Sequence, residues 1–289
     1  DNMRGGSNMS PYEAGQQAIT ALKSVDASKK GTVTAAYDAL RNNPNLQKES
    51  VPLLPIQTAV GKILQDYGDD AIPKNVITRL HEYGLSGQGT PSKTLTVQEA
   101  EKLKTLLNNN AGNDRSTQSL TKILKDSIDD AYTQMGNKEA SDLASKARGL
   151  AHERFQWQDM VPAAKAVVEN RATPDDFIKQ YVLNANTKEI SNMMLSLDGQ
   201  TQQALKAQVV NHLATKAGES VHGELGAFSQ AAYNKELARL GKERLTALFG
   251  KDGYATLTRV GRAAESMNRF PAGDSVNTSK TAGVLLGQM

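Results

Sequence analysis

Apolar side chains recur at intervals of three or four residues through most of the chain. Such series cover residues 103–107, 120–131, 177–182, 190–197 and 205–217. This spacing places the apolar side chains on one face of an α-helix. No stretch alternates apolar and polar residues over the length of a strand between hairpin signals. The pattern therefore predicts an all-α, multi-helix protein.

Capping signals mark where several helices begin. Ser10–Glu13, Thr96–Glu99 and Asn186–Glu189 each place a hydroxyl or amide side chain three residues before a glutamate, the spacing of a capping box. Thr173–Asp176 adds a proline at the first helical position and two acids in the first turn, where the helix dipole favours them. We expect helices to begin at these four places.

A proline divides the longest helical pattern, which covers residues 138–170. Pro162 removes a backbone donor and should break the helix near Met160. We place a boundary there and predict two helical lobes, at residues 10–160 and 161–268. Residues 1–9 carry no helix signal, and residues 269–289, rich in Gly, Asn and Ser, predict an extended C-terminal arm. Because the chain begins with Asp rather than Met, we also expect it to be a piece of a longer protein.

Composition excludes several classes of protein. The chain has 289 residues, with 34 basic and 31 acidic side chains and a net charge of +3, so its global field is too weak to indicate a nucleic-acid or membrane partner. It contains no cysteine, which excludes disulfides and thiolate sites. Aromatic residues are only 5%, which favours thin helical layers. No apolar run is long enough for an integral membrane segment.

Candidate catalytic and metal-binding residues form no recognisable constellation. The four histidines, at 81, 152, 212 and 222, lack ligand-like spacing, so we interpret them as surface or core residues. Adjacent acids such as Asp129 and Asp130 point about 100° apart on a helix, and we interpret them as solvated or capping. There is no phosphate-binding loop and no nucleophile elbow. We predict no catalytic residue, no cofactor and no metal site.

One pair of residues leaves an enzymatic alternative open. Glu49-Ser50 matches the catalytic Glu-Ser step of lytic transglycosylases, but Val51-Pro52 follows where that family has a Gly-Leu-Met-Gln element. Glycoside cleavage needs a positioned acid in a shaped cleft. A peptidoglycan-degrading activity, with Glu49 or Glu153 as the acid, is therefore kept as an alternative.

A basic cluster in residues 235–269 is the best candidate for a binding surface. Arg259 and Arg262 are three residues apart, share a helix face, and could contact phosphates of double-stranded DNA. Lys242, Arg244 and Arg269 extend the cluster. The competing interpretation is an ordinary exposed helix pair of mixed charge, since acids are interspersed and stacking aromatics are sparse.

A second group contains the only tryptophan. Arg154, Phe155 and Trp157 combine arginine with aromatic residues, a composition enriched in binding hot spots. They are therefore a candidate interface anchor. The competing interpretation is a buried anchor where the two lobes meet.

The order of motifs along the chain resembles a known family. The motifs are an Ala-Tyr-Asp-Ala-Leu-Arg core within 30–44, the helical patterns at 96–107, 120–132, 147–155, 177–182 and 233–249, and Phe270–Gly273 before Asn277–Ala282. That succession resembles the helical regions of large podophage-type internal virion proteins, and it covers most of the chain after residue 30. The resemblance implies a structural bacteriophage virion protein, a DNA-ejection component that acts as a scaffold or conduit in genome delivery.

The resemblance also implies partners and a location. We expect self-association or contact with other virion proteins, contact with double-stranded DNA, and a place in the virion with delivery into the host envelope. No catalytic residue is carried over from the family. A host-directed binding module is the remaining alternative.

Overall fold

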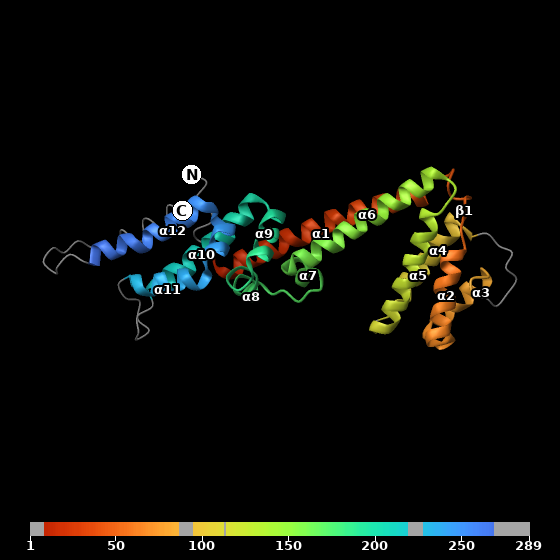
Figure 1. The fold of residues 1–289 in the computed structure, drawn as a ribbon, viewed down its shortest axis with the longest axis horizontal. Coiled ribbons are helices and arrows are strands. Elements are labelled where there is room, and N and C mark those ends of the chain that lie inside the picture. The colour runs from red at the N-terminus through yellow and green to blue at the C-terminus, as the bar shows by residue number, and fades with distance from the viewer. Residues whose placement is uncertain (1–8, 87–94, 113, 219–227, 269–289) are drawn as a thin grey trace. The chain divides into compact units, whose positions relative to one another are not determined.

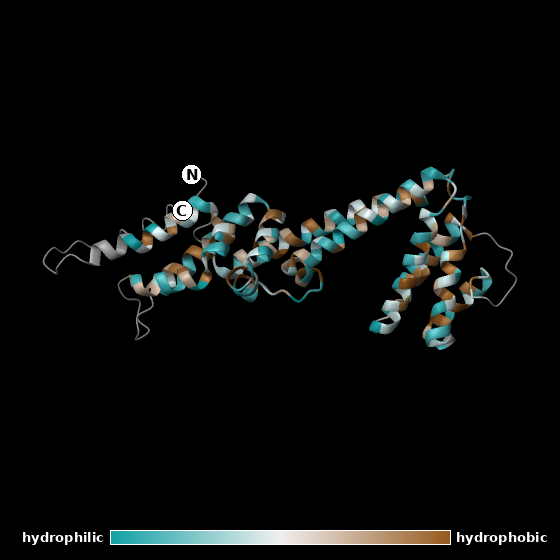
Figure 2. Ribbon diagram, viewed as in Figure 1, coloured by the Kyte–Doolittle hydropathy of each residue, from teal (hydrophilic) through white to brown (hydrophobic). Residues whose placement is uncertain are grey.

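The computed structural model describes residues 9–86, 95–112, 114–218 and 228–268 (Figure 1). Helices account for 81% of the structure, which confirms the all-α prediction. Figure 2 shows apolar and polar residues interspersed along the helices, as amphipathic helices require. The N-terminal residues 1–8 and the predicted arm at 269–289 lie outside the described residues.

The chain divides into two compact units. The inserted unit comprises residues 29–154, and the terminal unit comprises the described residues before 29 and after 154. The prediction placed residues 10–28 with the N-terminal lobe, whereas they form one unit with the C-terminal half of the chain. Helices α1 (Pro11–Arg41) and α6 (Lys138–Met160) each contribute residues to both units.

The inserted unit has one apolar core. Its elements are the C-terminal part of α1, β1 (Ser50–Val51), α2 (Leu54–Tyr67), the 3₁₀ turn η1 (Asp69–Ala71), α3 (Lys74–Glu82), β2 (Leu95–Thr96), α4 (Val97–Asn109), α5 (Arg115–Thr133) and the first part of α6. Helix α2 packs mainly on α5, and α4 packs on both α3 and α5. Strands β1 and β2 pair antiparallel, with Val51 opposite Leu95, and tie the start of α2 to the start of α4.

The terminal unit has a second apolar core. Its elements are the N-terminal part of α1, the end of α6, α7 (Pro162–Val168), α8 (Pro174–Ile178), the π-helical turn η2 (Lys179–Leu183), α9 (Thr187–Ser196), α10 (Gly199–Gly218), α11 (Gln230–Leu240) and α12 (Lys242–Asn268). Gly15 lets α1 approach α8, because a Cβ there would clash with the carbonyl oxygen of Pro174. Gly250 interrupts α12 with a positive φ of 75°.

The four predicted helix starts are confirmed. Thr96 and Asn186 form capping boxes with Glu99 and Glu189, and Ser10 exchanges the same bonds with Glu13. Helix α8 begins at Pro174, although Thr173 makes no side-chain capping bond. The break at Pro162 is also present, since α6 ends at Met160 and α7 begins at Pro162.

Candidate functional site

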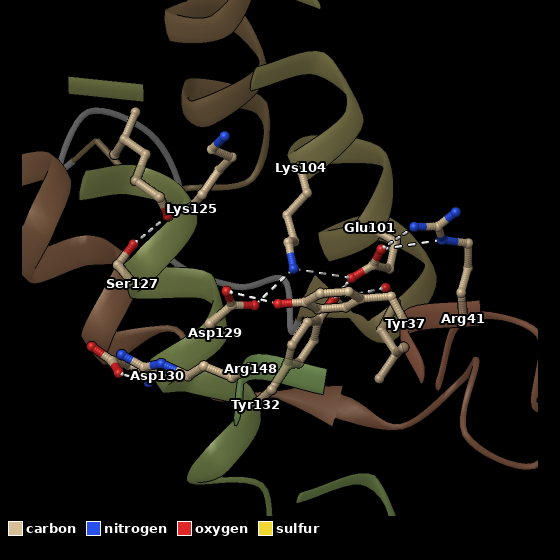
Figure 3. A network of polar contacts seen from close by, with 12 residues as sticks. Tyr37, Arg41, Glu101, Lys104, Lys125, Ser127, Asp129, Asp130, Tyr132 and Arg148 are labelled. Carbon is tan, nitrogen blue, oxygen red and sulfur yellow. Dashed lines mark hydrogen bonds and ion pairs between the residues drawn. The ribbon is translucent and has the colours of Figure 1, made fainter. Parts of the chain in front are cut away.

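A network of charged and hydroxyl side chains joins three helices of the inserted unit (Figure 3). Helical spacing assembles it, because residues three or four apart share one face of a helix. We call it the Glu101 cluster; it comprises Tyr37 and Arg41 of α1, Glu101 and Lys104 of α4, and Asp129 and Tyr132 of α5.

Glu101 is the most buried charge of this cluster, with its side chain 4% exposed. Its Oε2 accepts hydrogen bonds from Nε and Nη2 of Arg41 at 3.2 and 3.1 Å. Its Oε1 accepts a bond from the Tyr132 hydroxyl at 2.9 Å, and Nζ of Lys104 lies 3.7 Å away. Both carboxylate oxygens are therefore engaged by partners from three helices.

Lys104 is paired just as closely. Its Nζ donates to Oδ1 of Asp129 at 2.7 Å and lies 4.1 Å from the ring centroid of Tyr37, a cation–π distance. The Tyr37 hydroxyl donates to the other oxygen of Asp129 at 3.3 Å. This ammonium group is bonded to a carboxylate and covered by an aromatic ring, so it is not presented as a nucleophile.

The interpretation of Asp129 as a solvated or capping acid is wrong. Its side chain is 14% exposed because Lys104 holds it inside the unit. The adjacent Asp130 is 48% exposed and pairs with Arg148. The two neighbouring acids point to different partners, as their angular separation on the helix requires.

Burial controls the ionisation of the two tyrosines. It raises the pKa of Tyr132 well above the ordinary value, and the charge of Glu101 adds to the effect. Burial likewise raises the pKa of Tyr37, together with the charge of Asp129. Both phenols therefore stay neutral hydrogen-bond donors, and the cluster is suited to holding three helices together.

A second polar cluster lies in the terminal unit. Nε2 of His212 is 2.7 Å from Oε1 of Glu236, and Nε of Arg239 donates to both oxygens of that carboxylate at 2.8 and 2.9 Å. These bonds, led by the one from Arg239, lower the pKa of Glu236. In the part of the chain that the structure describes, no three His, Cys, Asp or Glu side chains are grouped to hold a metal ion.

Two of the other histidines belong to the inserted unit. His152 is exposed on α6, and His81 is partly exposed near the end of α3. His222 lies outside the described residues.

The basic residues predicted to contact DNA have different environments. Arg259 and Arg262 are exposed on α12, and so is Lys242, the first residue of that helix. Arg244 instead donates through Nη1 to the carbonyl oxygen of Leu183, and burial lowers its pKa. Arg244 thus satisfies the C-terminal end of η2, where a cation is favourable. Arg269 lies outside the described residues.

The predicted interface anchor separates into a core residue and a surface residue. Trp157 is 7% exposed in the core of the terminal unit, and its Nε1 donates to Oγ of Ser196 at 2.9 Å. Phe155 is 56% exposed on the same helix, and Arg154 is partly exposed. Trp157 is therefore an anchor of this core.

The two candidate acids both belong to the inserted unit. Glu49 is partly exposed just before β1, and its carbonyl oxygen accepts a bond from the amide of Val97 at 3.1 Å. Glu153 is exposed on α6. An open groove of about 650 Å³ lies elsewhere, between α1 and the start of α10, and neither acid lines it.

Sequence reasoning missed this groove and the Glu101 cluster. The groove residues Gln16, Thr20 and Gln200 look like ordinary exposed helix positions. Bonded partners in the Glu101 cluster are separated by up to 92 residues along the chain, as Tyr37 and Asp129 are. The local signals near the groove are helix caps: Glu13 belongs to the capping box with Ser10, and the Asp198 side chain accepts a hydrogen bond from the Thr201 amide at the start of α10.

Comparison with known proteins finds no relative: no family model matches the chain, and no curated protein or solved structure is similar to it. Among the described residues, no helix is both long and apolar enough to cross a membrane.

Proposed function

We propose that the chain is a structural component of a bacteriophage virion, which self-associates into a scaffold or conduit during DNA ejection. The observation that carries the structural role is that the polar side chains of its clusters are hydrogen-bonded to one another. Only two buried side-chain atoms of the described residues lack a hydrogen-bond partner, Gln17 Oε1 and Arg244 Nε. Catalytic sites keep perturbed groups available to a substrate, whereas the Glu101 cluster uses its charges on internal partners.

The virion and ejection part of the proposal comes from the order of motifs along the sequence. Its physical support is that the helices form two separate cores rather than one thick one. Small cores with many exposed backbone segments open more readily than a large core does. A protein that passes from a capsid into a cell envelope benefits from such opening.

Contact with DNA is proposed for the exposed face of α12. Arg259 and Arg262 lie three residues apart and are both exposed. Exposed guanidinium groups on one helix face can meet the phosphates of a duplex. Each neutralised phosphate releases counterions, which makes the contact salt-dependent.

Self-association is supported by large apolar side chains on the surface. Leu195 of α9 is 85% exposed, and Leu54 of α2 is 71% exposed. Single exposed apolar residues are common on monomers, so their presence alone does not identify an interface. Light scattering coupled to size-exclusion chromatography tests this part directly, over a range of protein concentrations.

The DNA test uses the same instrument with a short duplex of random sequence, at low and at moderate salt. We expect a complex at low salt that weakens as salt rises. Replacing Arg259 and Arg262 by glutamine should reduce the slope of log affinity against log salt by about 1 for each phosphate that is no longer neutralised. Replacing the exposed Lys62 and Lys102 of the inserted unit by glutamine removes the same charge and should leave the slope unchanged.

The outcomes separate the proposals. Defined oligomers and a salt-sensitive complex support a scaffold that contacts DNA. A monomer at every concentration that is indifferent to DNA would overturn both parts. Release of reducing sugars from cell walls would then favour the enzymatic alternative, and stoichiometric capture of a host protein would favour the host-directed module.

A further inference from the structure

Helices α1 and α6 each contribute side chains to both apolar cores. In α1, Leu22 belongs to the core of the terminal unit and Leu40 to that of the inserted unit. In α6, Ala144 belongs to the core of the inserted unit and Trp157 to that of the terminal unit. Each helix is therefore anchored by apolar packing on both sides of its middle part.

The middle part of each helix contributes no buried side chain. We call residues 27–36 of α1 the α1 segment and residues 149–156 of α6 the α6 segment; the structure describes all of them, and each is partly or fully exposed. Most helical stability in proteins comes from the packing of an apolar face, and a helix shorter than about 12 residues is marginal by itself. Both segments therefore lack the main source of stability that supports the rest of α1 and α6.

The residues of the α1 segment are also poor helix formers. A glycine and three β-branched residues follow one another at Gly31–Thr34. Glycine loses more backbone freedom in a helix than any other residue, and β-branched side chains lose rotamer freedom there. Close packing does not explain the glycine, because a Cβ at Gly31 would meet no atom within 4 Å. The same is true of Gly149 in the α6 segment.

Contacts on either side of the segments hold the two helices in place. In the terminal unit, Nε2 of Gln158 donates to Oδ1 of Asp26 at 2.8 Å, and both side chains are buried. In the inserted unit, the Tyr37 hydroxyl donates to Oδ2 of Asp129 at 3.3 Å, and Ala147 is 0% exposed. These contacts lie outside the segments, so a loss of helical bonds within a segment leaves them intact.

We propose that the α1 segment and the α6 segment open locally, exchanging their helical hydrogen bonds for water, while both apolar cores stay packed. Such an opening breaks only a few helical turns, whereas separating either core exposes buried apolar side chains to water. The use of the opening rests on the proposed function: in a protein that passes from a capsid into an envelope, these are the positions at which the chain yields first.

Native-state hydrogen exchange of the full chain, read by mass spectrometry, measures this opening directly. We expect the amides of the α1 segment and the α6 segment to exchange at least about a hundredfold faster than those of residues 14–22, because opening free energies range from near zero to the global value. Gly31→Ala should slow exchange in the α1 segment about two- to fivefold, since alanine suits a helix better than glycine does. Ala35→Gly, at an exposed position of the same segment, should speed exchange by about the same factor. Neither variant should alter exchange at residues 14–22.

Gly61→Ala in α2 is the matched control. Gly61 is also exposed, and a Cβ there would meet no atom within 4 Å. Its helix carries buried Val60 and Ile63, and the substitution lies outside both segments, so exchange in α1 and α6 should stay unchanged. Gly149→Ala tests the other helix and should slow exchange in the α6 segment about two- to fivefold.

Two results would overturn the proposal. One is equal protection of the α1 segment and of residues 14–22 in the unmodified chain. The other is a change of exchange in Gly31→Ala or Ala35→Gly that is absent, or equal in both stretches, since α1 would then open only together with its core. Self-association and DNA contact are measured separately by light scattering, so a failure of the proposed function is distinguishable from a failure of this opening.

Discussion

Replacing Lys104 by methionine should destabilise the inserted unit more than any other single change of a charged residue in α4 except one at Glu101. Methionine keeps the unbranched stem and about the same volume, so no large cavity forms. The ammonium group is removed, and Asp129 is left 14% exposed with only the Tyr37 hydroxyl as a partner. The variant therefore isolates the contribution of one charge.

The expected loss follows from the contacts of Nζ. The bond to Asp129 at 2.7 Å is charge-assisted and contributes about 1.5–3 kcal/mol. The cation–π contact with Tyr37 at 4.1 Å adds about 0.5–1 kcal/mol. Breaking a buried pair by removing one partner typically costs about 3–5 kcal/mol. Because Glu101 keeps Arg41, we expect a value near the lower end, about 3 kcal/mol.

Native-state hydrogen exchange of the α4 and α5 amides is the appropriate assay, since it does not assume a single unfolding transition for two units. Lys102→Met, two residues earlier on the exposed side of α4, should change the opening free energy by less than about 0.5 kcal/mol. The double variant Lys104→Met with Asp129→Asn should lose at least about 1.5 kcal/mol less opening free energy than the sum of the losses in the two single variants. A loss below about 1 kcal/mol, or an additive double variant, would refute the assigned pairing.

Three further perturbations have defined outcomes. Burial and the charge of Glu101 raise the pKa of Tyr132 in the folded protein, so the neutral phenol stabilises the fold fully below the unfolded pKa of about 10, and this contribution is lost as pH rises above that value. In Tyr132→Phe the urea midpoint of unfolding should therefore fall less steeply with rising alkaline pH than in the unmodified chain. Gly15→Ala should lower the free energy of unfolding by about 1–3 kcal/mol, as followed by thermal unfolding, because its Cβ would clash with Pro174. The control Gly31→Ala, in the same helix, meets no atom within 4 Å and should raise that free energy by about 0.5–1 kcal/mol. Thr96→Ala should lower stability by about 1 kcal/mol and increase exchange in the first turn of α4.

Helix starts could be predicted from the sequence because their physical cause is local. The bonds between Thr96 and Glu99, and between Asn186 and Glu189, join residues three apart, so a short window contains both partners. The buried pairs lack such a signal. Lys104 and Asp129 lie 25 residues apart on different helices, and nothing in either segment identifies the other as its partner.

The assignment of residues 10–28 to the N-terminal lobe illustrates the same limit. Apolar periodicity identifies the face of a helix that is buried, but it does not identify what covers that face. Ala14, Ala18 and Leu22 of α1 belong to the same core as Phe177, far along the chain. The sequence contains one clue, Gly15. Glycine lowers helix propensity, so a glycine inside a helix suggests that another segment packs closely against it, as α8 does here.

The buried charges of the inserted unit also select one alignment of its helices. Leucines recur along α4 at four-residue steps, as at Leu103 and Leu107, so a slip of α4 by one turn would still bury apolar side chains. The same slip would separate Lys104 from Asp129 and leave Glu101 without its hydroxyl partner. An uncompensated buried charge costs about 3–5 kcal/mol, so the Glu101 cluster penalises the wrong alignment more than it stabilises the right one. A scaffold that must open and refold during delivery, as proposed above, requires this discrimination because apolar packing alone would permit several alignments.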